Sequence, residues 1–155
     1  MEKFLIFILL AFISANISDE RFYNHKYSKW NAEKFLTGKF VNNLGSKCNL
    51  IAKHGKLTGS YSSKPSRGTL VEKSFPISGV YTPVEDGVLL SFIVTFEMEG
   101  KNQQGLKKVS TATWNGKIFS NQKSFKMNWL LVSNQNDENE WYATNVGQDQ
   151  FTKVK

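Results

Sequence analysis

Cysteine is almost missing from this chain of 155 residues, because Cys48 is the only one. No disulfide can form within the chain, which excludes the small disulfide-stapled folds that are frequent among secreted proteins. We predict that Cys48 is a buried small apolar residue. A bridge to another chain is the alternative.

Proline is also scarce, with 3 residues, and charged residues make up only 21% of the chain. Aromatic residues, by contrast, reach 14%. This composition excludes a disordered or collagen-like chain, and the length fits one globular domain with a real core. Abundant aromatic rings favour half-buried β-sheet or a ring-lined pocket.

Long apolar runs are confined to the beginning of the chain. Lys3 precedes the apolar run Phe4–Ile13, and the small residues Ser14 and Ala15 follow it. Such a run is too short to span a bilayer, and the pattern is typical of a secretory signal peptide. We therefore expect a signal peptide at residues 1–15, an N-terminal extension at 16–36 and a folded domain at 37–155. A secreted protein with no membrane partner follows.

Negative charge is in deficit, since 20 Lys and Arg residues stand against 13 Asp and Glu residues, which gives a net charge of +7. The lysines are scattered along the chain and form no arginine-rich helix. This pattern indicates a solvated surface, so no nucleic-acid partner is predicted.

From Thr37 onward, short apolar and polar alternations are separated by Gly, Asn and Ser turns, the pattern of an antiparallel meander. Closing such a sheet removes its exposed edges and encloses room for one small ligand. We predict an all-β fold, an eight-stranded antiparallel up-and-down β-barrel. Its expected strands are Thr37–Asn42, Lys47–His54, Lys56–Ser63, Thr69–Ile77 with Tyr81 as the furthest end, Val88–Glu99, Lys107–Phe119, Ser124–Val132 and Ala143–Val154. The preceding segment Asp19–Phe35 lacks clean periodicity and is either a flexible extension or a short helix.

Residues suited to enzyme chemistry are few. The only histidines, His25 and His54, lie in the extension and at a turn, which leaves little material for a catalytic triad or a zinc site. Two carboxylate pairs fall in or beside loops, Glu97 with Glu99 and Glu138 with Glu140, where solvated charge is the default. We therefore predict a binding protein and not an enzyme, with no metal and no cofactor.

Five segments stand out by their order and spacing: Gly38–Ser46, Leu57–Ser63, Ser110–Gly116, Trp129–Leu131, and Trp141 with Val146–Val154. Together they resemble the avidin and streptavidin family over residues 37–155. The resemblance implies an avidin-like barrel that binds biotin tightly and non-covalently in its interior.

The resemblance also implies a polar cluster around the urea group of biotin, which offers one carbonyl oxygen and two N–H groups. The matching donors for the oxygen are Asn42, Ser46 and Tyr61, and the matching acceptors for the N–H groups are Ser63 and Asp149. The Asp149 carboxylate would accept in a charge-assisted bond.

An aromatic box is the second implied part of the site. Its walls are Phe96, Trp114 and Trp129, and Trp141 of a neighbouring subunit forms the lid, with packing against its own barrel as the alternative. The remaining implied contacts are Leu44, Ser66, Arg67, Gly68, Ser110, Ala112 and Leu131. Among them, Ser110 and the loop Lys64–Gly68 match the positions around the carboxylate tail. We expect Arg67 to face water, and a pair with that carboxylate is the alternative.

Two residues of the implied ligand site depart from the family pattern. Phe96 stands where a Trp is usual, and Ala112 stands where a Thr hydroxyl meets the ring sulfur. Thr111 and Thr113 point to the other face of an ideal strand, so only a bulge could replace that hydroxyl. Binding should be weaker without being abolished.

The dipeptide Asn115–Gly116 ordinarily marks a two-residue hairpin. The resemblance instead keeps Lys107–Phe119 as one strand and places the turn at Ser120–Lys123, and we adopt this second interpretation.

Two other functions fit a secreted barrel. One is a lipocalin-like carrier of another small apolar ligand. The other is a barrel-type protease inhibitor that uses Asp19–Phe35 as its inserting arm.

For assembly, the resemblance implies a homo-oligomer, with a tetramer as the expected form. Association would also cover apolar residues on the outside of the barrel.

Overall fold

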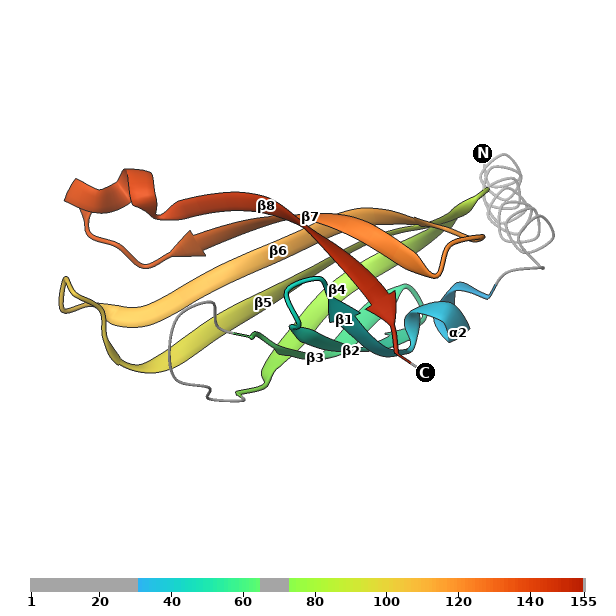
Figure 1. The fold of residues 1–155 in the computed structure, drawn as a ribbon, viewed down its shortest axis with the longest axis horizontal. Coiled ribbons are helices and arrows are strands. Elements are labelled where there is room, and N and C mark those ends of the chain that lie inside the picture. The colour runs from blue at the N-terminus through green and yellow to red at the C-terminus, as the bar shows by residue number, and fades with distance from the viewer. Residues whose placement is uncertain (1–30, 65–72, 155) are drawn as a thin grey trace, which may run out of the picture. The chain divides into compact units, whose positions relative to one another are not determined.

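The computed structural model describes residues 31–64 and 73–154. Eight antiparallel strands pair in chain order within this range, and β8 pairs with β1, so the sheet closes into a barrel (Figure 1). The predicted eight-stranded up-and-down β-barrel is confirmed. Its strands are β1 (Gly38–Asn42), β2 (Lys47–Lys53), β3 (Lys56–Ser62), β4 (Phe75–Val84), β5 (Gly87–Lys101), β6 (Lys107–Phe119), β7 (Ser124–Ser133) and β8 (Thr144–Lys153).

Two short helices accompany the strands in the described range, α2 (Ala32–Leu36) and the 3-10 helix η1 (Asp137–Tyr142). No helix in residues 31–64 or 73–154 is both long and apolar enough to cross a membrane. The expected signal peptide at 1–15 and residues 16–30 of the expected extension lie outside the described residues. The last residues of that extension form α2.

Alternation of the side chains builds the core, because successive residues of a strand point to opposite faces. In β2, the buried residues Cys48, Leu50 and Ala52 alternate with exposed ones. At one end of the barrel, the Phe125 ring stacks on Phe151 at 5.5 Å between centroids. The chain has no disulfide to link its strands, so packing of inward side chains such as these rings holds the strands together.

The same end of the barrel is held by α2 and by Lys153 at the end of β8. Leu36 of α2 is fully buried. The Lys153 ammonium donates hydrogen bonds to the carbonyl oxygens of Phe35 at 2.6 Å and Thr37 at 2.9 Å, and it lies 5.6 Å from the centroid of the Phe40 ring. A cation at the C-terminal end of a helix offsets the partial negative charge of the unpaired carbonyls. The short helix is thereby tied to the barrel.

The hairpin signal at Asn115–Gly116 does not make a turn. Gly116 continues β6 between Leu90 of β5 and Met127 of β7. A Cβ on Gly116 would lie 2.8 Å from the Lys126 carbonyl oxygen. The glycine thus serves close strand packing, and the expected uninterrupted strand Lys107–Phe119 is confirmed.

Two expectations about the elements need correction. The fourth strand begins at Phe75 and not at Thr69: Lys73 and Ser74 are outside it, and residues 69–72 lie outside the described range. It ends at Val84, because the ladder with β5 continues past Pro83. The second correction concerns Asp137–Tyr142, which was expected to contain no helix and forms η1, with Trp141 inside it.

Candidate functional site

Four polar residues from separate elements meet inside the barrel: Asn42 at the end of β1, Ser46 in the β1–β2 loop, Tyr61 in β3 and Asp149 in β8. Each is almost completely buried, and Asp149 is only 2% exposed. Buried polar groups are costly unless they are hydrogen-bonded. Their gathering in one place therefore indicates a site.

The Asp149 carboxylate has one satisfied and one unsatisfied oxygen. Oδ2 accepts from Asn42 Nδ2 at 3.0 Å and from Trp114 Nε1 at 3.1 Å. Oδ1 is buried without a hydrogen-bond partner among the residues that the structure describes. An unpaired carboxylate oxygen in a dry environment has a strong preference for an N–H or O–H donor.

The Asn42 side chain has a donor left over. Its Oδ1 accepts from the backbone N–H groups of Ser46 at 2.7 Å and Leu44 at 3.1 Å. These bonds fix the amide in the β1–β2 loop, where Gly45 adopts a φ of 86°. Because the side-chain amide carries two N–H bonds and Asp149 receives only one of them, the other can donate to a ligand.

Tyr61 and Ser46 supply the hydroxyl groups of the cluster and form a side-chain hydrogen bond with each other. Burial raises the pKa of Tyr61 well above its usual range, and the nearby Asp149 carboxylate adds to this. Tyr61 therefore keeps its proton as a donor over the accessible pH range. Ser46 Oγ also accepts from the backbone N–H of Lys64 at 3.0 Å. The bond between the two hydroxyl groups uses one of their two hydrogens, which leaves the other to donate.

Aromatic rings surround this cluster, with Trp114 at their centre. Phe92 stacks on Trp114 at 5.1 Å, Tyr61 lies 4.9 Å away, and Phe96 meets it edge-on at 6.5 Å. Phe75 of β4 packs against Phe96 at 5.0 Å. Such offset and edge-on pairs give a rigid apolar wall.

Sequence reasoning missed Phe75 and Phe92 as parts of this wall. The alternation Phe92, Val94, Phe96 in β5 already placed Phe92 on the face of Phe96. Phe75 carried no such signal, because its strand was expected to begin earlier.

Strand β7 supplies the rest of the interior wall. Trp129 lies opposite Trp114 in the ladder, and Leu131 lies opposite Ala112. Trp129 and Leu131 are half-buried, so this wall reaches the open part of the barrel. Ser110 lies opposite Ser133, a further inward hydroxyl that sequence reasoning also missed.

The Ala112 position is regular. The ladder between β5 and β6 runs without a register shift from Gly87 to Glu97, and the buried Ala112 pairs with Val94 inside it. The Thr111 hydroxyl lies 3.4 Å from that of Thr95, at an exposed position. No bulge turns a neighbouring threonine inward in this segment, so Ala112 presents only a methyl group.

Other expected site residues lie at the edge of the cluster or beyond it. Leu44 is 62% exposed, Ser63 is exposed just after β3, and Trp141 on η1 is 93% exposed. The expected contacts Ser66, Arg67 and Gly68 lie outside the described residues.

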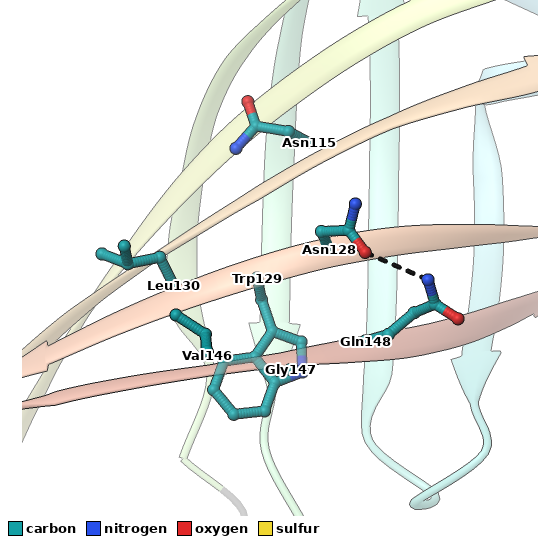
Figure 2. Close-up of a pocket in the computed structure, with 7 residues that line it drawn as sticks. All are labelled: Asn115, Asn128, Trp129, Leu130, Val146, Gly147 and Gln148. Atoms are coloured by element: carbon teal, nitrogen blue, oxygen red, sulfur yellow. Dashed lines mark hydrogen bonds between the residues drawn. The ribbon is translucent and has the colours of Figure 1, made fainter.

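A hollow lies over β6, β7 and β8, lined by residues of all three strands (Figure 2). Asn128 and Gln148 are hydrogen-bonded across it at 3.0 Å. The remaining lining residues are Asn115, Trp129, Leu130, Val146 and Gly147.

Groups suited to catalysis are not assembled in the described parts of the chain. His54 is exposed at a turn, and Glu97 forms an ion pair with Lys107 at the surface. No three His, Cys, Asp or Glu residues within 31–64 and 73–154 could hold a metal ion. Cys48 is 2% exposed, and burial raises the pKa of its thiol to about 12, so the expectation of a buried apolar role is confirmed.

Comparison with known proteins gives a consistent result. The family model described as "Avidin family" matches residues 31–154. The chain is 28% identical over 126 residues to "Avidin" from Gallus gallus, an alignment that covers 77% of this chain and 78% of that protein. It is 30% identical over 129 residues to "Avidin-related protein 4/5" from Gallus gallus, with 77% of each chain covered.

Proposed function

The chain belongs to the avidin family, and on that premise we propose that it binds biotin tightly and without covalent chemistry inside the barrel. The ligand is the free vitamin, bound by its urea group among the buried polar residues and by its fused rings among the aromatic ones. Biotin would be a ligand here and not a cofactor.

One observation carries this proposal: the buried Asp149 Oδ1 has no partner among the described residues. A urea N–H would satisfy it with a charge-assisted hydrogen bond. On the opposite side of the urea, the carbonyl oxygen would accept from Asn42, Ser46 and Tyr61. Asn42 has a second N–H to donate, and the Ser46 and Tyr61 hydroxyl groups would exchange their mutual hydrogen bond for bonds to this oxygen. Ser63 would accept from the second urea N–H.

The aromatic rings suit the apolar part of the same ligand. Trp114, Phe96 and Trp129 face the interior beside the polar cluster, so they would cover the fused rings. Ala112 and Leu131 would meet the ring sulfur and the start of the aliphatic chain. Ser110, with Leu44, Ser66, Arg67 and Gly68, would surround the carboxylate tail.

No reaction is needed in this account, and we propose that the protein is not an enzyme. Neither a lipocalin-like carrier nor a barrel-type protease inhibitor requires a buried carboxylate beside the donor groups of Asn42, Ser46 and Tyr61. Burying such a group without a matched ligand is costly.

We further propose that the protein is secreted after removal of residues 1–15 and that it assembles from copies of itself, most simply as a tetramer. Trp141 is 93% exposed and Val146 is 72% exposed, and Leu130 and Val132 add apolar surface on β7. Exposed apolar surface of this kind marks association sites. Trp141 would then close the pocket of a neighbouring subunit.

Calorimetric titration with biotin and with an analogue that lacks the urea group tests the proposed function. We expect saturable binding of biotin and much weaker binding of the analogue, because the analogue leaves Asp149 Oδ1 unpaired. Equal affinities for the two compounds would overturn the proposal.

A further inference from the structure

Gly147 in β8 lies directly opposite Trp129 in β7. Residues two apart in a strand share a face. Gly147 therefore faces the interior together with Asp149, and Trp129 faces it together with the fully buried Met127. Figure 2 shows the Trp129 ring overlapping β8 at Gly147.

The Trp129 ring occupies the space where a side chain on residue 147 would begin. A Cβ on Gly147 would lie 2.7 Å from Cε2 and 3.1 Å from Cη2 of Trp129, and still closer to Cζ2. Carbon atoms in contact stay about 3.5 Å apart or more. A methyl group at this position and the ring in its present place therefore exclude each other.

The backbone gives no other reason for a glycine here. Gly147 is not among the glycines with a positive φ, unlike Gly45 or Gly59. It lies within a regular ladder, where a larger residue would be the ordinary choice. The absence of a side chain at Gly147 allows the Trp129 indole to approach β8.

We propose that Gly147 is a positioning residue, which sets the Trp129 ring against β8 beside Asp149 and thereby fixes the apolar wall next to the buried carboxylate. Its consequence for affinity rests on the proposed function. The position of the ring is a property of the ligand-free protein and can be tested without biotin.

The test compares Gly147→Ala, Trp129→Phe and the double variant with the wild-type protein. In proton–nitrogen spectra of ligand-free protein, the indole N–H signal of Trp129 is identified by its loss in Trp129→Phe. We expect Gly147→Ala to move this signal and to leave that of Trp114, which is bonded to Asp149, in place. Biotin affinity should fall roughly tenfold or more in Gly147→Ala.

The double variant separates positioning from general damage to the barrel. Phe lacks the Cζ2 and Cη2 atoms that the new methyl would meet, so adding Gly147→Ala to Trp129→Phe should weaken binding little further. Gly116→Ala is the matched control, because its Cβ would press on the Lys126 carbonyl oxygen and the Met127 side chain, whereas that of Gly147→Ala meets the Trp129 ring. That variant should lower the melting temperature and leave the Trp129 signal unmoved.

An unmoved Trp129 signal in Gly147→Ala would overturn the inference. So would an equal loss of affinity from Gly147→Ala in the wild-type and Trp129→Phe backgrounds. If wild-type protein fails to bind biotin, the proposed function fails, and the Trp129 signal alone decides the role of Gly147.

Discussion

At the scale of single residues, a few side chains have properties that a folded core alone does not require. Asp149 is almost fully buried, and one of its carboxylate oxygens has no hydrogen-bond partner in residues 31–64 and 73–154. Ala112, by contrast, presents a methyl group where the avidin-like pattern has a hydroxyl. The first feature favours ligand binding, and the second limits its strength.

Replacing Ala112 with Thr should tighten biotin binding by about 1 kcal/mol, because one neutral hydrogen bond to the ring sulfur is regained. The strand is regular at this position, so the new hydroxyl would point inward. Thr111→Ala is the control, since it removes a hydroxyl from the outer face and should leave affinity unchanged. Titration calorimetry measures both. Unchanged or weaker binding by Ala112→Thr would contradict the assignment of this wall.

Cys48 should not react with Ellman's reagent at pH 8 in the native protein, because burial raises the pKa of its thiol to about 12. The unfolded thiol ionises near pH 8.5. Folding therefore favours the neutral form, and this contribution to stability is complete below about pH 8.5 and is lost as the pH rises toward 12.

Urea unfolding of the wild-type protein and Cys48→Ala at pH 8 and pH 10 measures that loss. The wild-type protein should lose more stability between the two pH values than the variant does. Rapid labelling of the native thiol would contradict the buried placement.

At the scale of elements, the short helix α2 is held in place by contacts with the barrel strands. Lys153 of β8 donates to carbonyl oxygens at the end of α2, and Glu33 of α2 accepts from the Tyr81 hydroxyl at 2.7 Å and from the His54 backbone N–H at 2.7 Å. The helix has only five residues, too few to be stable by itself. Its presence depends on these contacts and on the buried Leu36.

Lys153→Met should lower the free energy of unfolding by about 1 kcal/mol, because the carbonyl groups of α2 lose a charged donor. Lys126→Met, at an exposed position of β7, is the control and should change stability little. Urea unfolding gives the comparison. Equal stability of the two variants would show that Lys153 does not anchor α2.

Strands with clear alternation were predictable from the sequence, and those interrupted by other constraints were not. β2 was expected from its alternation at Lys47–His54 and is found at Lys47–Lys53. β6 is found at the expected Lys107–Phe119, where the resemblance outweighed the hairpin signal at Asn115–Gly116. β4 was expected at Thr69–Ile77 and is found at Phe75–Val84, because pairing with β3 begins at Phe75 and pairing with β5 continues to Val84. Periodicity does not report which partner a strand finds.

Part of the candidate site was also predictable from the sequence, and part was not. Asn42, Ser46, Tyr61 and Asp149 were expected to converge, and they do. The roles of Phe75 and Gly147 could not be predicted, because an extra ring and a missing Cβ acquire meaning only when the facing strand is known. Trp141 was expected as a lid, and its exposure on η1 is consistent with that role without testing it.

At the scale of the whole molecule, the barrel alone leaves much apolar surface uncovered. Trp141→Lys should weaken both self-association and biotin binding, because one side chain would serve the subunit contact and the pocket of the neighbour. Light scattering with and without biotin measures the first effect, and calorimetry measures the second. A wild-type monomer that binds biotin tightly would contradict the shared site.

The central claim is that a buried carboxylate receives an N–H of the biotin urea. Calorimetric titration of wild-type protein and Asp149→Ala with biotin tests it most directly, with Thr58→Ala on the exposed face of β3 as the control. Loss of a charged acceptor should weaken binding by about tenfold to a hundredfold in Asp149→Ala, while Thr58→Ala binds like wild type. Wild-type affinity in a folded Asp149→Ala variant would contradict the account.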